Sequence, residues 1–124
     1  MVDGGTGIDT AVYSRHTSAI WVDLDGGMGD DGASGEGDSV LSIERLYGTS
    51  YHDVLIGSSG ADTIDGGYGN DSIYGLGGSD ALFGGEGADN LFGGAGSDSL
   101  DGGPGSSDHC ELGAEGSFMT GCES

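Results

Sequence analysis

Single aliphatic side chains recur every nine residues along the second half of this chain. Alternate side chains of a strand face opposite sides, so one inward aliphatic between two outward neighbours fits a strand of about three residues. The pattern therefore predicts a series of very short strands joined by turns. The inward residues that it predicts are Leu55, Ile64, Ile73, Leu82, Leu91 and Leu100.

Two polar positions follow the same period of nine. An aspartate stands two residues before each aliphatic, at Asp53, Asp62, Asp71, Asp80, Asp89 and Asp98. A glycine stands five residues before each aspartate, at Gly48, Gly57, Gly66, Gly75, Gly84 and Gly93. Glycine accepts backbone angles that other residues avoid, and it has no Cβ to obstruct carbonyls that turn toward a common point. Each nonapeptide therefore divides into a glycine-rich turn ending at an aspartate and a strand.

The segment Gly66–Tyr74 contains a complete G-G-x-G-x-D-x-U-x pattern, in which U is aliphatic, and the nonapeptides from Gly84 and Gly93 repeat it. This pattern resembles the RTX, or haemolysin-type, calcium-binding family. The resemblance implies an all-β fold, a parallel β-roll of the β-helix or solenoid type, with two short-stranded parallel sheets over a thin aliphatic core. Two nonapeptides then form one coil.

The pattern has departures at both ends of the repeats. Thr49, Tyr51, Ser58 and Leu76 replace glycines of the turns. One inserted residue places Asp108 one position late, and Cys110 takes the aliphatic position. We therefore expect metal binding to be weakest at the two ends.

Calcium suits these turns because it takes 6–8 oxygen ligands from carboxylates and carbonyls, whereas zinc prefers Cys and His. We expect each ion to lie between two turns one coil apart, with four to six ions in all. The expected pairs are Asp53/Asp71, Asp62/Asp80, Asp71/Asp89 and Asp80/Asp98, with Asp89/Asp108 as a weaker one. The glycines expected to contribute are Gly66, Gly67, Gly69, Gly75, Gly77, Gly84, Gly85, Gly87, Gly93, Gly94 and Gly96. Scattered partial repeats add Asp9, Asp31 and Asp38.

The chain is expected to form one domain over residues 1–124, with regular repeats at 48–109. Residues 1–47 are expected to hold irregular repeats and an N-terminal cap, in which Ile20, Val22 and Leu24 mark one strand, residues 40–46 mark another and Trp21 is packed. Residues 110–124 are expected to form a C-terminal cap. Its two cysteines, Cys110 and Cys122, are expected to form a disulfide, as in other exported proteins.

The net charge of the chain excludes some classes of binding partner. It has 22 acidic residues against two Lys and Arg, a net charge of -20, which argues against nucleic acid or an anionic membrane as partner. No apolar run is long enough to span a membrane. Such a charge fits either disorder or a cation-binding chain, so we expect the calcium-free chain to be unfolded. Its three histidines lie in no catalytic motif, and no enzyme activity is expected.

By resemblance, the chain is expected to be a monomeric module of a secreted protein that folds on calcium outside the cell and assists export. A catalytic or adhesive domain of the parent protein is expected outside this sequence. An alternative function is adhesion or carbohydrate binding through an outer ladder of Ile56, Tyr74 and Phe92. The opposite sheet shows Asp65, Phe83 and Asp101 at the same positions. Stacking that only stabilises the sheet explains this ladder as well.

Overall fold

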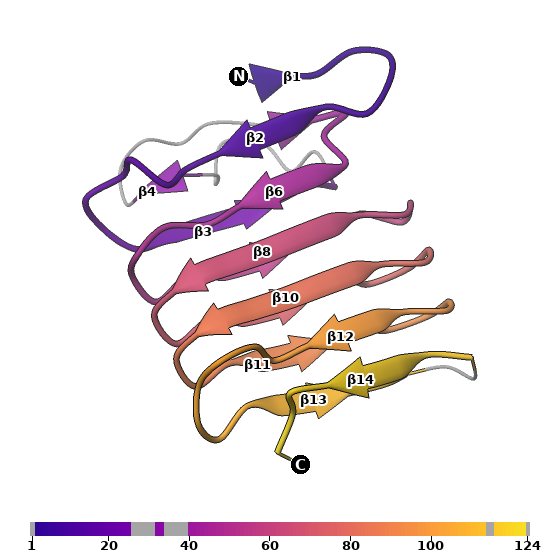
Figure 1. The fold of residues 1–124 in the computed structure, drawn as a ribbon. Coiled ribbons are helices and arrows are strands. Elements are labelled where there is room, and N and C mark those ends of the chain that lie inside the picture. Colours follow the sequence, from indigo (N-terminus) through magenta and orange to yellow (C-terminus); the bar gives the residue numbers. More distant parts are fainter. Residues whose placement is uncertain (1, 26–31, 34–39, 114–115, 124) are drawn as a thin grey trace.

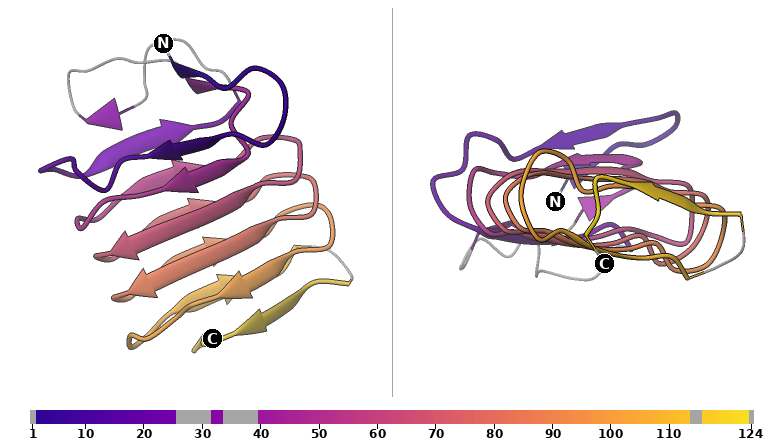
Figure 2. Two further views of the ribbon diagram at one scale, coloured as in Figure 1. Left: turned by 45° about the horizontal axis from the view of Figure 1, so that its top comes forward. Right: turned by 60° about the horizontal axis from the view of Figure 1, so that its bottom comes forward.

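The structure is a computed structural model that describes residues 2–25, 32–33, 40–113 and 116–123. In these residues every regular element is a strand, and the chain winds as a flattened coil whose two ends carry the two termini (Figures 1 and 2). Two predicted ligands, Asp31 and Asp38, lie outside the described residues. No helix within the described ranges is long and apolar enough to cross a lipid bilayer.

Two six-stranded sheets form the body of the roll. The first sheet has the order β14 (Phe118–Thr120), β12 (Ser99–Asp101), β10 (Ala81–Glu86), β8 (Thr63–Tyr68), β6 (Arg45–Tyr47), β2 (Thr10–Val12). The second sheet has the order β13 (His109–Glu111), β11 (Asn90–Phe92), β9 (Ser72–Tyr74), β7 (Val54–Ile56), β3 (Ile20–Asp23), β4 (Gly32–Ala33). All pairs are parallel except β3 with β4. The predicted parallel β-roll is therefore confirmed.

The core is a double row of aliphatic side chains between the sheets. Leu46, Ile64, Leu82 and Leu100 stand opposite one another in the first sheet, and Leu55, Ile73 and Leu91 do so in the second. All seven are fully buried. Each strand buries only one side chain, so the apolar core is small. Interactions within and between the turns must therefore contribute much of the stability of the roll.

The N-terminal segment supplies strands to both sheets. β2 pairs with β6, and β3 pairs with β7, so residues 10–23 already form a coil of the roll. β1 (Val2–Asp3) and β5 (Val40–Leu41) form a separate two-stranded sheet. The strand predicted over residues 40–46 is divided into β5 and β6, because Ser42 turns the backbone with a φ of 55°.

Trp21 does not pack within a cap, contrary to the prediction. Its side chain is 57 % exposed on the outer face of the second sheet. The reason is the alternation along β3, which turns Ile20 and Val22 into the core and leaves Trp21 on the opposite side.

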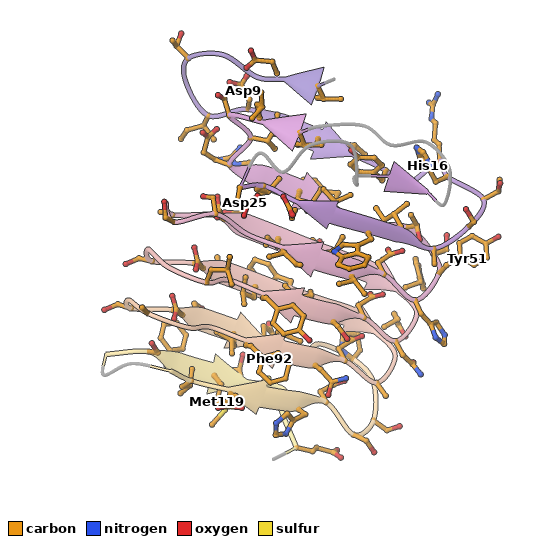
Figure 3. The ribbon with its side chains drawn as sticks, turned by 180° about the vertical axis from the view of Figure 1, so that it is seen from behind. Asp9, His16, Asp25, Tyr51, Phe92 and Met119 are labelled. Atoms are coloured by element: carbon orange, nitrogen blue, oxygen red, sulfur yellow. A yellow bond between two sulfur atoms is a disulfide. The ribbon has the colours of Figure 1, made fainter. Side chains whose placement is uncertain are left out.

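The predicted outer ladder is present on that face. Ile56, Tyr74 and Phe92 are in register across β7, β9 and β11. The rings of Tyr74 and Phe92 are stacked, with centroids 4.9 Å apart and planes 7° apart, and Figure 3 shows Phe92 on this side of the roll. His109 meets Phe92 edge-on, at 6.0 Å between ring centroids.

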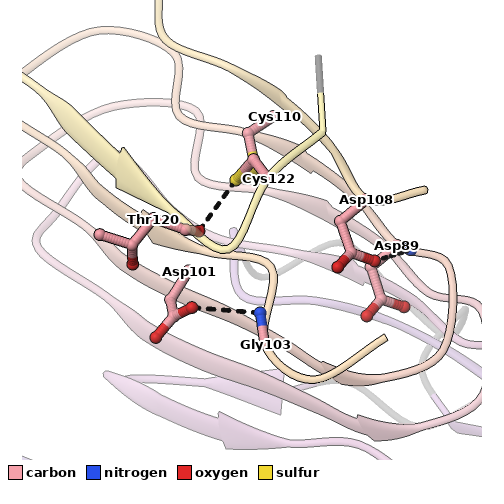
Figure 4. The surroundings of a disulfide bond; sticks show 7 residues. All are labelled: Asp89, Asp101, Gly103, Asp108, Cys110, Thr120 and Cys122. Carbon is pink, nitrogen blue, oxygen red and sulfur yellow. Dashed lines mark hydrogen bonds between the residues drawn. A yellow bond between two sulfur atoms is a disulfide. The ribbon is translucent and has the colours of Figure 1, made fainter. Parts of the chain in front are cut away.

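The C-terminal end carries the predicted disulfide. Cys110 and Cys122 are bonded, with their Cα atoms 5.8 Å apart (Figure 4). Cys110 is in register with Leu91 and is buried in the core. The bond therefore holds the last loop against the last coil of the roll.

Candidate metal centre

Seven repeat aspartates form two buried columns along the edges of the roll. One column contains Asp53, Asp71, Asp89 and Asp108, and the other contains Asp62, Asp80 and Asp98. At most 3 % of any of these residues is exposed. Within each column the main-chain N–H of one aspartate donates to Oδ1 of the aspartate one coil further along, at 2.7–3.0 Å. Each predicted pair is therefore brought together.

Asp108 occupies the same place in its column as the other aspartates. The N–H of Asp89 donates to Oδ1 of Asp108 at 2.9 Å, across 19 residues rather than 18 (Figure 4). The turn before Asp108 absorbs the inserted residue, and Ser107 takes a φ of 72° there. Asp108 therefore lies in register with its column although it comes one position late in the sequence, because register is set by strand pairing and not by the count within the turn. Weaker metal binding at Asp89/Asp108 stays a prediction.

The second column continues upstream through a residue that the sequence interpretation missed. The N–H of Asp9 donates to a side-chain oxygen of Glu44 at 3.0 Å. Register places Glu44 beside Asp62, since Arg45 pairs with Thr63. Counting back one coil of 18 residues from Asp62 also arrives at Glu44, so the signal was present. At the other end, Ser117 accepts from the N–H of Asp98 at 2.9 Å in place of a carboxylate.

The later turns share an unusual backbone. We call the turns 66–71, 75–80, 84–89 and 93–98 the glycine turns, because their second and fourth residues all have positive φ. These residues are Gly67, Gly69, Leu76, Gly78, Gly85, Gly87, Gly94 and Gly96. In the turn 75–80 the fourth residue is Gly78, whereas the predicted Gly77 forms a β-bridge with Ala95. The early half-repeat has the same backbone, with φ of 86° at Gly5 and 118° at Gly7.

The first glycine of each nonapeptide turn from Gly48 to Gly84 leaves room between two kinds of oxygen. A Cβ on Gly66 would meet Oδ2 of Asp71 and, at 2.6 Å, the carbonyl oxygen of Gly84 from the next coil. The same arrangement recurs at Gly75, with Asp80 and Gly93, and at Gly84, with Asp89 and Gly102. A carboxylate and a main-chain carbonyl from successive coils therefore face the same small space.

The carboxylates of the glycine turns have an unused oxygen. Within the part of the chain that the structure describes, no donor reaches Oδ2 of Asp71, Asp80, Asp89 or Asp98. Buried polar atoms are almost always satisfied, so four such oxygens in equivalent places indicate a missing partner. A cation that binds oxygen would supply such a partner.

Burial also makes the charge of these groups unfavourable. The pKa of Asp71 and of Asp80 is raised to about 7, mainly by desolvation, and neighbouring carboxylates of the same column contribute to this rise. Desolvation likewise raises the pKa of Asp89, with Asp108 adding to it. A divalent cation would reverse this, because an opposite charge nearby favours the ionised form.

The oxygen set fits calcium. Among the described residues, no three His, Cys, Asp or Glu side chains converge on one point. Any cation held by these columns must therefore take carbonyl oxygens as well as carboxylates, and calcium accepts both. Carboxylate oxygens without donors are present in Asp71, Asp80, Asp89 and Asp98. In the first two turns, by contrast, the carboxylates of Asp53 and Asp62 accept hydrogen bonds from hydroxyl side chains.

Comparison with known proteins agrees with the geometry. A family model described as RTX calcium-binding nonapeptide repeat, in four copies, matches residues 47–82 and 74–107. No curated protein matches the chain. Repeats of this kind bind Ca²⁺. Through these repeats the chain belongs to the RTX calcium-binding nonapeptide repeat family.

Proposed function

We propose that this chain is a calcium-binding β-roll module of a secreted protein, and that calcium completes its folding. The observation that carries the proposal is the set of four buried Oδ2 atoms without donors, in Asp71, Asp80, Asp89 and Asp98. Three of them border a carbonyl oxygen as described above, whereas the three atoms nearest to a Cβ on Gly93 all belong to Asp98.

Each ion would be held between two turns of one column. The pairs best suited are Asp71 with Asp89, Asp80 with Asp98 and Asp89 with Asp108, with carbonyls of the intervening glycines as further ligands. Calcium supplies charge compensation and links successive coils. Magnesium requires near-octahedral geometry and keeps its waters, so it should substitute poorly.

Folding and binding should be one event. Without a cation, stacked buried carboxylates oppose folding, and the net charge of -20 adds self-repulsion. Because no complete site exists in an unfolded chain, the free energy of ion binding contributes to folding. Extracellular calcium modules often bind at about 10⁻⁴–10⁻³ M, which would keep the calcium-binding coils unfolded inside a cell and fold them outside.

The remaining properties follow from this role. The Cys110–Cys122 disulfide fits an oxidising compartment. We infer that the module stabilises its parent protein or assists its export, has no catalytic activity of its own and works as a monomer. A catalytic or adhesive function would then belong to another domain of the parent protein.

Far-ultraviolet circular dichroism with calcium tests this function. We expect the strand signal in EDTA to be well below that in calcium and to rise cooperatively as calcium is added, with several ions bound per chain by calorimetry. Magnesium at the same concentration is the control and should produce little change. A chain that binds no calcium, or that binds a single ion, would contradict the proposal.

A second candidate function is glycan binding by the outer face of the second sheet. The exposed Trp21 favours it, because Trp21 lies on the same face as the stacked pair of Tyr74 and Phe92. Aromatic faces of this kind bind sugar rings by stacking their apolar surfaces. The variant Trp21→Ala should lose binding on a glycan array while keeping its calcium-dependent dichroism, and Phe83→Ala on the opposite sheet is the control. Equal array signals for both variants would exclude this face.

A further inference from the structure

The first two nonapeptide turns are closed by hydroxyl side chains rather than left open. We call residues 48–53 and 57–62 the hydroxyl-capped turns. Their second residues are Thr49 and Ser58, and no residue within either turn has a positive φ. They therefore differ from the glycine turns in both chemistry and backbone conformation.

Thr49 satisfies the carboxylate of its own turn. Its N–H donates to Oδ2 of Asp53 at 2.6 Å, and its hydroxyl donates to Oδ1 at 2.8 Å. The N–H of Ile20 donates to the same Oδ1 at 3.0 Å. The hydroxyl of Thr49 in turn accepts from the N–H of Tyr51 at 2.9 Å. Both oxygens of Asp53 thus have donors, which stabilise a carboxylate without any cation.

Ser58 repeats this arrangement nine residues later. Its N–H and its hydroxyl both donate to Oδ2 of Asp62, at 2.6 and 3.0 Å. Its hydroxyl also accepts from the N–H of Gly60 at 3.0 Å. The hydroxyl at the second position therefore links the fourth and the sixth residues of the turn. In the glycine turns the equivalent Oδ2 atoms are without donors in the described structure.

The coil that carries these turns also has a larger apolar core around it. Residues 11–24 contribute five buried side chains, Ala11, Tyr13, Ile20, Val22 and Leu24. A regular nonapeptide contributes a single buried aliphatic. Burial of apolar surface stabilises by about 25 cal/mol per Å². This part of the roll buries more apolar side chains than a regular nonapeptide, so its folding needs less stabilisation from bound calcium.

We propose that residues 10–24 and 45–64 form a calcium-independent base of the roll, in which Thr49 and Ser58 take the place that calcium has in later turns. The pairs Asp53/Asp71 and Asp62/Asp80 then hold no ion, and calcium fills the sites from Asp71 onward. The base provides the edges on which the calcium-bound coils assemble. This inference rests on the proposed function, since it concerns which turns need the ion.

One substitution converts a hydroxyl-capped turn into the complete pattern. Ser58→Gly gives G-G-x-G-x-D over residues 57–62, removes the hydroxyl donor and permits positive φ at position 58. We expect this variant to bind one more calcium ion per chain than the wild type, measured by calorimetry and by native mass spectrometry. The matched control is Ser59→Gly, one position later in the same turn, where the side chain is exposed.

Amide hydrogen exchange in EDTA tests the base directly and does not depend on ion counting. We expect amides of residues 45–64 in the wild-type chain to exchange at least about tenfold more slowly than those of residues 72–101. Thr49→Ala and Ser58→Ala should lose this protection in EDTA, and calcium should restore slow exchange over residues 72–101 in all variants.

An unchanged ion count in Ser58→Gly relative to Ser59→Gly would overturn the inference. So would equally fast exchange of residues 45–64 and 72–101 in EDTA. A wild-type chain that binds no calcium would instead overturn the proposed function, and slow exchange at 45–64 in that chain would leave the base itself supported.

Discussion

The main-chain N–H of Asp71 donates a hydrogen bond of 2.7 Å to a carboxylate oxygen of Asp89, one coil further along the roll. The other oxygen of Asp89 has no donor within the described residues. One side chain therefore has two separable roles. One oxygen joins successive coils, and the proposed role of the other is to bind a cation.

Replacing Asp89 separates these roles. Asp89→Asn keeps an acceptor for the N–H of Asp71 but removes the charge, so we expect a folded chain at high calcium with affinity reduced by about tenfold or more, as even outer-shell metal partners are worth about 10–100-fold. Asp89→Leu removes both roles and should prevent folding of the later coils. Calcium titration followed by circular dichroism measures both effects. Glu111→Gln, at the exposed end of β13, is the control and should titrate like the wild type.

Replacing a positive-φ glycine of a glycine turn with alanine should destabilise the roll. Gly67 has a φ of 97°, and a Cβ there would lie 2.6 Å from the carbonyl oxygen of Thr49. We expect Gly67→Ala to destabilise the calcium-bound roll by about 1–2 kcal/mol from backbone conformation alone, and by more from the contact. Thermal unfolding in calcium measures this. Gly60→Ala is the matched control. The φ of Gly60 is not positive, and a Cβ there would lie 3.5 Å from its nearest neighbour, the hydroxyl oxygen of Ser58.

Leu76 occupies a positive-φ position that is glycine in the other glycine turns. Its φ is 72°, and its side chain is 47 % exposed. Leu76→Gly removes the steric cost of a left-handed conformation, about 1–2 kcal/mol, while losing little buried apolar surface. We expect a higher melting temperature in calcium. A lower melting temperature would show that the Leu76 side chain contributes packing that outweighs its conformational cost.

In EDTA, acid should favour the folded state. The pKa of Asp71 and of Asp80 is about 7 in the folded chain, because burial disfavours their charge, against 3.8 as the ordinary value. The folded state thus binds more protons, so the stability from these groups is present below pH 3.8 and is lost as the pH rises through about 7. We expect strand content in EDTA to increase from about pH 8 to about pH 5. The double variant Asp71→Asn, Asp80→Asn should lose most of this dependence.

Breaking the disulfide should loosen the C-terminal end. Cys110 and Cys122 are 12 residues apart, and closing a loop of this size stabilises by about 3 kcal/mol in the chain-entropy model. We expect reduction by dithiothreitol to lower the melting temperature of the calcium-bound chain. The double variant Cys110→Ser, Cys122→Ser should melt at the temperature of the reduced wild type and be insensitive to dithiothreitol. A reduced chain as stable as the oxidised one would contradict this role.

The nine-residue period by itself predicted a series of short strands and turns, and the resemblance that its residues carry implied the parallel roll. The period predicts which side chain of each strand faces inward, as Ile73 and Leu82 show, and it places an aspartate at the end of every turn. This works because strand alternation and turn conformation are local properties, set within one nonapeptide. The same local reasoning identified Ile56, Tyr74 and Phe92 as an outer ladder.

Only the tertiary structure decided what each turn does. Asp53 and Asp71 occupy the same place in the repeat, yet the first accepts hydrogen bonds from Thr49 and Ile20 while the second has an unused oxygen. Asp108 joins its column despite an inserted residue. The bonds from Thr49 lie within one turn, but the bond from Ile20 to Asp53 and the bond from Asp89 to Asp108 join residues of different coils. The bonds between coils form only when the coils stack, so a nine-residue sequence period cannot predict them.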